Sequence, residues 1–260
     1  MEYQNILSEL KENILYLTIN RESKLNALNK ATLTELADAI AYATTSSEVR
    51  GVLLTGAGEK AFVAGADISE FQDYSLAEGK ELGRSGQENV FDAIANSPKP
   101  FVAAINGFAL GGGLELAMAC HIRIAAENAK LGLPEVTLGL IPGYGGTQRL
   151  TQLVGKGRAI EMITTADMIT AEKAEQIGLV NYVVPQADLI STAESILAKI
   201  KQRAPLAVAS ALHAINASLN PTVNGFAVEI EEFGNCFQTE DFKEGVAAFL
   251  AKRKPIFTGK

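Results

Sequence analysis

The sequence predicts an α/β core followed by an all-helical segment. Short apolar runs that suit strands recur through the first part of the chain, and segments of helical periodicity lie between them. From about residue 187 onward the pattern is helical only. We therefore expect a core over residues 1–186, which would hold the active site, and a helical oligomerisation region over residues 187–260.

Three runs are typical of strands, because they are rich in β-branched or apolar residues and end in turn residues. They are Ile14–Ile19, residues 49–55 and Phe101–Ile105. A helix is predicted to begin near Asn29, where apolar residues fall on one face. That face comprises Leu33, Leu36, Ala37 and Ile40.

Prolines mark the other helix boundaries. A second helix, carrying Phe91 and Ile94, is predicted to end before Pro98. In the last part of the chain, Pro205 and Pro221 stand where helices are expected to restart.

Length and composition allow a single domain with a hydrophobic core. The chain has 260 residues, of which 47% are hydrophobic, so it can bury a sizeable core. Its acidic first residues resemble neither a signal peptide nor a transit peptide, so a cytoplasmic location is expected. Residues 101–120 are long and apolar enough to suggest a membrane span, but their glycines and Glu115 favour a buried core segment.

Charge and metal-ligand spacing exclude several classes. A net charge of −7 without a lysine or arginine block argues against nucleic acid as a partner. Cys120 and Cys236 give no disulfide framework or zinc spacing, and His121 and His213 are isolated, so no metal site is expected. An anionic ligand would need local positive charge, for which the candidates are Arg21, Lys24 and residues 252–254.

Two isolated carboxylates are the strongest functional signal. Glu115 is the only charge between Pro100 and Ile122, and Glu135 is the only one between Lys130 and Arg149. An unpaired buried carboxylate is costly, whereas a dry pocket raises its pKa toward the working pH of an acid–base group. Both lie beside glycine-rich turns, which favours a shared site.

A structural interpretation of these glutamates stays open at this point. Either carboxylate could answer a buried arginine, and Arg123 and Arg149 lie nearby in the sequence.

Five segments resemble the enoyl-CoA hydratase/isomerase (crotonase) superfamily, and the similarity extends over essentially the whole chain. Residues 104–120 (AINGFALGGGLELAMAC) and 133–150 (LPEVTLGLIPGYGGTQRL) are similar to its two signature segments. Residues 62–68 (FVAGADI), 20–28 (NRESKLNAL) and 169–184 (ITAEKAEQIGLVNYVV) are similar to three further ones.

The resemblance implies an architecture and partners. Repeated ββα turns would form a spiral, and the C-terminal helices would mediate assembly into a homotrimer or a hexamer built from two trimers. The substrate would be an acyl-CoA, so coenzyme A is part of the substrate and no separate cofactor is expected.

The resemblance also implies a catalytic arrangement. Glycines before a helix let a ligand approach its unpaired N–H groups, and Gly112 precedes the predicted helix over residues 114–120. By resemblance, the backbone N–H groups of Gly112 and Ala66 would form an oxyanion hole. Glu115 would help to take a proton from water, and Glu135 would hold the water and deliver a proton to Cα.

The coenzyme A segment follows from the same resemblance. Besides Ala66 and Gly112, the binding residues would be Lys24 near the phosphates, the backbone around Ala64 and Ile68 near the adenine, and Asp67. Asp67 is also expected to cap a helix that starts near Ser69.

The sequence departs from the commonest family pattern at two positions, which leaves the local ion pairing and the shape of the acyl pocket undetermined. His121 stands where many members carry aspartate, and Leu114 stands where cysteine is frequent. The two glutamates favour hydration of a trans-2-enoyl-CoA to a 3-hydroxyacyl-CoA. The alternatives are a Δ3–Δ2-enoyl-CoA isomerase and, with less support, an RNA-binding relative.

Overall fold

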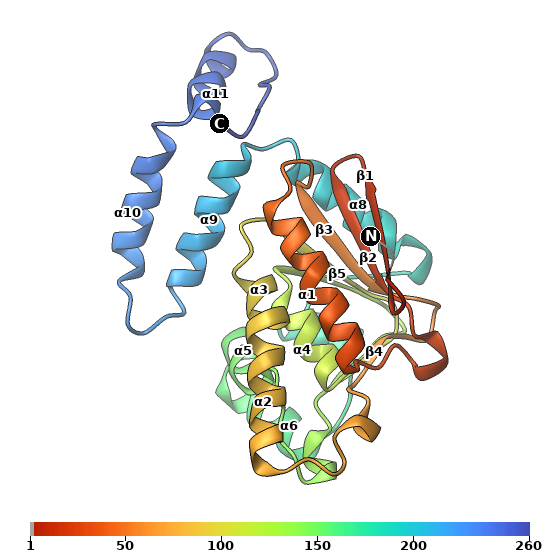
Figure 1. Ribbon diagram of the computed structural model, residues 1–260. Helices are drawn as coiled ribbons and strands as arrows, with labels where there is room; N and C mark the ends of the chain where they lie inside the picture. The colour runs from red at the N-terminus through yellow and green to blue at the C-terminus, as the bar shows by residue number, and fades with distance from the viewer. Residues whose placement is uncertain (1–2) are drawn as a thin grey trace.

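A computed structural model describes residues 3–260. Two β-sheets form the core of the fold, and helices pack around them (Figure 1). The larger sheet has the order β1-β2-β3-β5-β7-β10. Its strands are β1 (Ile6–Lys11), β2 (Ile14–Ile19), β3 (Gly51–Gly56), β5 (Phe101–Ile105), β7 (Ile122–Ala126) and β10 (Tyr182–Val184). The smaller sheet has the order β4-β6-β8-β9, from β4 (Ala61–Ala64), β6 (Phe108–Leu110), β8 (Lys130–Gly132) and β9 (Ile169–Thr170).

The connectivity is a spiral of ββα turns, as the resemblance implies. Successive turns contribute β3 and β4, then β5 and β6, then β7 and β8, with one strand of each pair in each sheet. Neighbouring strands from successive turns are parallel, and helices complete each turn. The three strands predicted from sequence are present, with the second shifted to Gly51–Gly56.

Helices surround the sheets and form the last part of the chain. In the first part they are α1 (Lys30–Thr45), α2 (Leu76–Gly86), α3 (Asp92–Ala95), α4 (Gly112–Ala119), α5 (Gly146–Val154), α6 (Lys156–Thr165) and α7 (Ala171–Gln176). The last part holds α8 (Leu189–Ile200), α9 (Pro205–Ala217), α10 (Gly225–Cys236) and α11 (Glu240–Leu250). Short helical turns include η1 (Glu22–Lys24), η2 (Ile68–Glu70), η3 (Gln87–Phe91) and η4 (Glu135–Leu138).

The predicted helix boundaries are confirmed at Asn29 and Pro205 and wrong at Pro221. Asn29 caps α1 by accepting a hydrogen bond from the Thr32 N–H, and Pro205 is the first residue of α9. Pro221 lies instead in the connecting loop, because Asn224 supplies the cap that starts α10.

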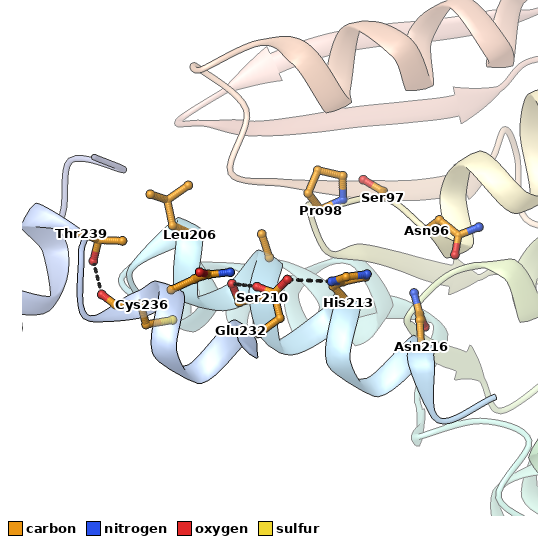
Figure 2. Close-up of a pocket in the computed structure, with 12 residues that line it drawn as sticks. Asn96, Ser97, Pro98, Leu206, Ser210, His213, Asn216, Glu232, Cys236 and Thr239 are labelled. Carbon is orange, nitrogen blue, oxygen red and sulfur yellow. Dashed lines mark hydrogen bonds and ion pairs between the residues drawn. The ribbon is translucent and has the colours of Figure 1, made fainter. Parts of the chain in front are cut away.

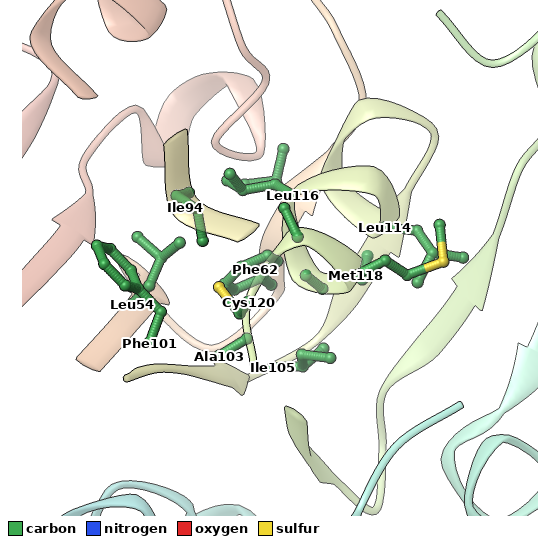
Figure 3. Packing of buried hydrophobic residues seen from close by; sticks show 14 of the residues in the cluster. Leu54, Phe62, Ile94, Phe101, Ala103, Ile105, Leu114, Leu116, Met118 and Cys120 are labelled. Atoms are coloured by element: carbon green, nitrogen blue, oxygen red, sulfur yellow. The ribbon is translucent and has the colours of Figure 1, made fainter. Parts of the chain in front are cut away.

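Helix α4 is the buried centre of the core. Every residue of α4 is buried, and Cys120 directly follows it inside the apolar cluster. Figure 3 shows Leu114, Leu116 and Met118 of this helix among side chains from the surrounding strands. Residues 101–120 are thus a core segment, and no helix within residues 3–260 is long and apolar enough to cross a membrane.

The C-terminal helices divide into one that covers the core and three that extend from it. Leu189, Ala193 and Leu197 of α8 pack on the larger sheet. By contrast, α9, α10 and α11, drawn in blue, stand away from the sheets (Figure 1). Large apolar side chains on this extended part are exposed, among them Phe226 at 82% and Phe249 at 83%.

Candidate active site

Glu115 is held at the start of α4 by two backbone donors. Its Oε1 accepts hydrogen bonds from the N–H groups of Tyr144 and Gly146, each at 2.7 Å. Both donors come from the glycine-rich turn that leads into α5, and a Cβ on Gly146 would lie 2.8 Å from Oε1. A glycine at this position therefore lets the turn close on the carboxylate.

Glu135 approaches the same helix end from η4. It is the first residue of η4, and its Oε1 lies 3.0 Å from the position a Cβ on Gly111 would take. Gly111 is the N-cap of α4, and its carbonyl accepts the N–H of Glu115. The structure thus brings both glutamates to the N-terminus of one buried helix.

Burial dominates the electrostatics of this pair. Glu115 is 1% exposed, and burial raises its pKa to about 7, with the Glu135 charge adding to the rise and the two N–H bonds opposing it. Burial also raises the pKa of Glu135, whose Oε2 is buried without a hydrogen-bond partner among the described residues. An unsatisfied buried carboxylate oxygen beside a second carboxylate is suited to hold a water or a substrate proton.

The nearby arginines do not neutralise either glutamate. Arg123 is buried and donates to the carbonyls of Leu179 and Cys120, at 2.8 and 2.5 Å. Arg149 pairs with Asp92 and donates to the Tyr144 carbonyl. Neither arginine forms an ion pair with Glu115 or Glu135, so the ion-pair interpretation is wrong. The Arg149 charge only lowers the pKa of Glu115 from a distance.

Ala66 and Gly112 follow the ends of two paired parallel strands. Strands β4 and β6 run parallel with Ala64 opposite Leu110, and Ala66 and Gly112 each lie two residues beyond that pair. Ala66 also forms a bridge with Leu28 in which Asp67 donates its N–H to the Leu28 carbonyl, so the N–H of Ala66 points the other way. Gly112 is the first residue of α4, where a helix N–H has no intrahelical acceptor.

The predicted coenzyme A segment lies along the same strand end. Leu25 accepts the N–H of Ala64, and Leu28 donates to the Gly65 carbonyl, so η1 with Lys24 borders this strand. Buried Asn26 anchors the segment by donating to the carbonyls of Ala57 and Ala61. Ile68 follows in η2 and is exposed.

Asp67 does not cap the following helical turn as the sequence predicts. It occupies the N-cap position of η2, but its side chain makes no capping bond to a backbone N–H. It accepts instead from the Ser69 hydroxyl at 2.7 Å and pairs with Arg21 at 3.0 Å, and both contacts hold its pKa below the ordinary value. Arg21 is therefore engaged in an ion pair with Asp67, whereas the neighbouring Lys24 is exposed.

The other predicted cations and histidines lie elsewhere. Residues 252–254 follow α11, away from α4 (Figure 1), and Arg253 pairs with Glu244. His121 accepts the Phe101 N–H at 2.9 Å, and burial lowers its pKa to about 4, so it does not replace an aspartate charge. Leu114 is fully buried in the core.

A cavity of about 450 Å³ lies between α9, α10 and residues 96–98, apart from the two glutamates. Figure 2 shows that Ser210 and His213 of α9 both point to Glu232 of α10, with which they make hydrogen bonds of 2.5 and 2.8 Å. These contacts join the two helices. Within residues 3–260 no group of three His, Cys, Asp or Glu side chains is placed to hold a metal ion.

Sequence reasoning missed the residues that hold Glu115. In the sequence, the glycine-rich turn at residues 142–146 stands out only as a neighbour of Glu135. Its role as a pair of N–H donors to Glu115 depends on contacts across 29 and 31 residues, which no local pattern encodes.

Known proteins share both sequence and fold with this chain. The family model for enoyl-CoA hydratase/isomerase matches residues 9–260. A short-chain-enoyl-CoA hydratase of Clostridium acetobutylicum is 49% identical over 98% of this chain and 97% of its own length. A crotonyl-CoA hydratase of Syntrophomonas wolfei is 48% identical over the whole of both chains.

A solved structure gives the same result for the fold. The crystal structure of an enoyl-CoA hydratase from Bacillus anthracis matches with a TM-score of 0.93 and 41% identity, over 99% of this chain and 100% of that one. The chain belongs to the enoyl-CoA hydratase/isomerase family. Within that family, the comparisons confirm the predicted fold and the predicted activity class, that of the enoyl-CoA hydratases.

Proposed function

We propose that this chain adds water across the double bond of a trans-2-enoyl-CoA, with Glu115 and Glu135 as its acid–base pair. The observation that carries the proposal is the meeting of two buried carboxylates at the N-terminus of α4, the helix that begins at Gly112.

The reaction develops negative charge on the thioester oxygen. Water attacks Cβ, the electrons of the double bond shift toward the carbonyl, and an enolate forms. The N–H groups of Ala66 and Gly112 stabilise this oxyanion, a contribution of about 10²–10³ in rate per donor. The dipole of α4 acts in the same direction.

Protons move between water and the two carboxylates. Glu115 accepts one proton of the attacking water, whose oxygen becomes the hydroxyl on Cβ. Glu135 holds that water and gives a proton to Cα, on the same face, which completes a syn addition. Each such group contributes about 10²–10⁴ in rate. The pair must carry one proton in all, and burial of both carboxylates favours that state.

The coenzyme A moiety is assigned to the segment beside β4. Lys24 is exposed and meets the phosphates, while the backbone at Ala64 and Ile68 borders the adenine. Asp67 contributes by fixing Arg21 and the start of η2. No further cofactor takes part in this scheme.

The assembly proposed is a homotrimer or a hexamer made of two trimers. A helix that is apolar on more than one side needs more than one partner surface, and the extended helices expose Phe226, Ile230, Phe233 and Phe249. Neighbouring copies of the chain would cover these faces.

The test is hydration of crotonyl-CoA by the purified protein, followed as the loss of absorbance of the conjugated thioester. Turnover to the 3-hydroxyacyl-CoA is expected. The proposal fails if short, medium and long trans-2-enoyl-CoA substrates are all left unchanged by protein whose circular dichroism shows it to be folded.

A further inference from the structure

The side chain of Tyr144 is fixed next to the proposed oxyanion hole. A Cβ on Gly112 would lie 3.5 Å from the Tyr144 ring, so the ring borders the residue that supplies one donor. The ring stacks on Phe91 with centroids 4.7 Å apart and planes 15° apart. On another side, a Cβ on Gly86 of α2 would lie only 2.3 Å from the ring.

The ring therefore has no room to swing aside. Phe91 is fully buried, and α2 is held over the turn by Gln87, which follows it and donates to the Gly143 carbonyl at 2.7 Å. Tyr144 itself is 6% exposed, and its hydroxyl makes no hydrogen bond to another described residue. A hydrogen bond of the hydroxyl therefore does not account for a tyrosine at this position. The volume of its ring does, because the ring fills the space beside Gly112.

The proposed reaction directs the acyl chain toward this ring. If the thioester oxygen lies at Ala66 and Gly112, Cβ lies next to the water on Glu115. The carboxylate of Glu115 is bound by the backbone N–H of Tyr144 at 2.7 Å. The carbon atoms beyond Cβ then start close to Glu115 and therefore close to Tyr144.

We propose that the Tyr144 side chain is the specificity-determining wall of the acyl site and restricts the substrate to short enoyl-CoA thioesters. This inference rests on the hydratase function proposed above. A clamped aromatic ring accepts a chain that ends at about the crotonyl methyl group and rejects a chain that would have to pass through the ring. Closely packed side chains do not move far enough to make room for several additional methylene groups of a longer acyl chain.

The experiment compares kcat/KM for crotonyl-CoA and trans-2-decenoyl-CoA in the full-length enzyme and its variants. The wild type is expected to prefer crotonyl-CoA. Tyr144→Ala should lower the crotonyl-to-decenoyl ratio of kcat/KM at least about tenfold, since pocket methylenes discriminate on that scale. Tyr144→Phe should keep the wild-type ratio, because it removes only the hydroxyl.

Two further variants make the result decisive. Tyr144→Leu shortens the wall while keeping the site filled, so it should lower the ratio even if Tyr144→Ala does not fold. Tyr182→Ala makes the same truncation at a half-exposed tyrosine of β10 in the other sheet, and it should leave the ratio unchanged.

The outcomes separate this inference from the proposed function. If the wild type hydrates no enoyl-CoA, the proposed function is wrong. If the wild type hydrates both substrates equally well, or if folded Tyr144→Leu retains the wild-type ratio, the enzyme is a hydratase and Tyr144 is not its wall.

Discussion

Glu115 and Glu135 differ in how the protein satisfies their oxygens. Glu115 Oε1 accepts two backbone N–H bonds, whereas Glu135 Oε2 is buried and has no partner in the described part of the chain. A carboxylate held by fixed donors suits accepting a proton from a bound water, and a carboxylate with an open oxygen suits holding that water and exchanging a proton with substrate. The two neutral variants should consequently differ in kind.

Glu115→Gln should reduce hydration of crotonyl-CoA by about 10²–10⁴, yet leave measurable proton exchange at Cα. Glu135→Gln should abolish both, and the double variant should be little worse than Glu135→Gln alone, because groups that act as a unit are not additive. Exchange is measured as deuterium incorporation into butyryl-CoA in heavy water. Glu127→Gln, at an exposed glutamate, is the matched control.

The assignment of roles is reversed if Glu115→Gln loses exchange while Glu135→Gln keeps it. If neither variant changes hydration tenfold, the carboxylates are structural. Strong double-bond migration by the wild type without hydration would instead favour the isomerase.

The buried Glu115 also predicts a pH-dependent stability. Its pKa in the folded protein is raised from 4.5 to about 7, so the native state holds the proton more tightly than the unfolded state. Stability is then lost as pH rises from about 4.5 to about 7, by about 3 kcal/mol at 1.36 kcal/mol per pKa unit. Glu115→Gln keeps an acceptor for Tyr144 and Gly146 and has no such loss.

Urea unfolding of wild type and Glu115→Gln at pH 5 and pH 8, at equal protein concentration, measures this effect. The variant should gain free energy of unfolding relative to wild type at pH 8 and little at pH 5. A difference that is the same at both pH values would contradict the raised pKa.

At the scale of elements, α4 sits so close to β4 that one of its residues must be glycine. A Cβ on Gly113 would lie 2.0 Å from the Val63 carbonyl oxygen and 2.7 Å from the Val63 Cβ. The same contact sets the distance between the helix that carries Glu115 and the strand that leads to Ala66. Close packing of α4 on β4 thus joins the two halves of the site.

Gly113→Ala should destabilise the protein by about 1–3 kcal/mol or prevent folding, because overpacking displaces backbone. Gly157→Ala in α6 is the matched control, since a Cβ there meets nothing within 4 Å. That control should be neutral or stabilise by up to about 1 kcal/mol. Thermal unfolding of both variants measures the contrast, and equal melting temperatures would show that α4 can shift without cost.

At the scale of the whole molecule, one chain leaves its last three helices incompletely covered. Helix α10 packs on α9, but both stand away from the sheets and expose a wide apolar surface (Figure 1). Burying such a surface stabilises an assembly by about 25 cal/mol per Å² of apolar area. A chain of 27.6 kDa should therefore be found in solution as a multiple of that mass.

Light scattering at micromolar concentration should return a trimer or a hexamer for the wild type. Phe226→Asp, which places a charge at a position that is 82% exposed in one chain, should lower the mass. Thr34→Asp on the exposed side of α1 introduces the same charge and should leave the mass unchanged. A wild type that elutes as a folded monomer would refute the assembly.

The amino-acid sequence by itself determines the local elements and the family of this protein. Asn29 before an amphipathic run determines where α1 begins, and β-branched runs determine β2 and β5. The lone charges at Glu115 and Glu135 indicate the pair, because solvation cost depends on residue type and on the apolarity of the flanking chain. The motifs also indicate the family, which the relatives confirm.

The tertiary structure alone decided which groups meet. Ala66 and Gly112 each lie two residues beyond the pair that Ala64 and Leu110 form in the register of β4 and β6, and register depends on pairing between segments that are distant in sequence. The N–H bonds to Glu115, the Arg21–Asp67 pair and the clamp on Tyr144 likewise join separate turns of the spiral. A sequence pattern reports the environment each residue requires, but only packing of the whole chain determines which neighbours provide it.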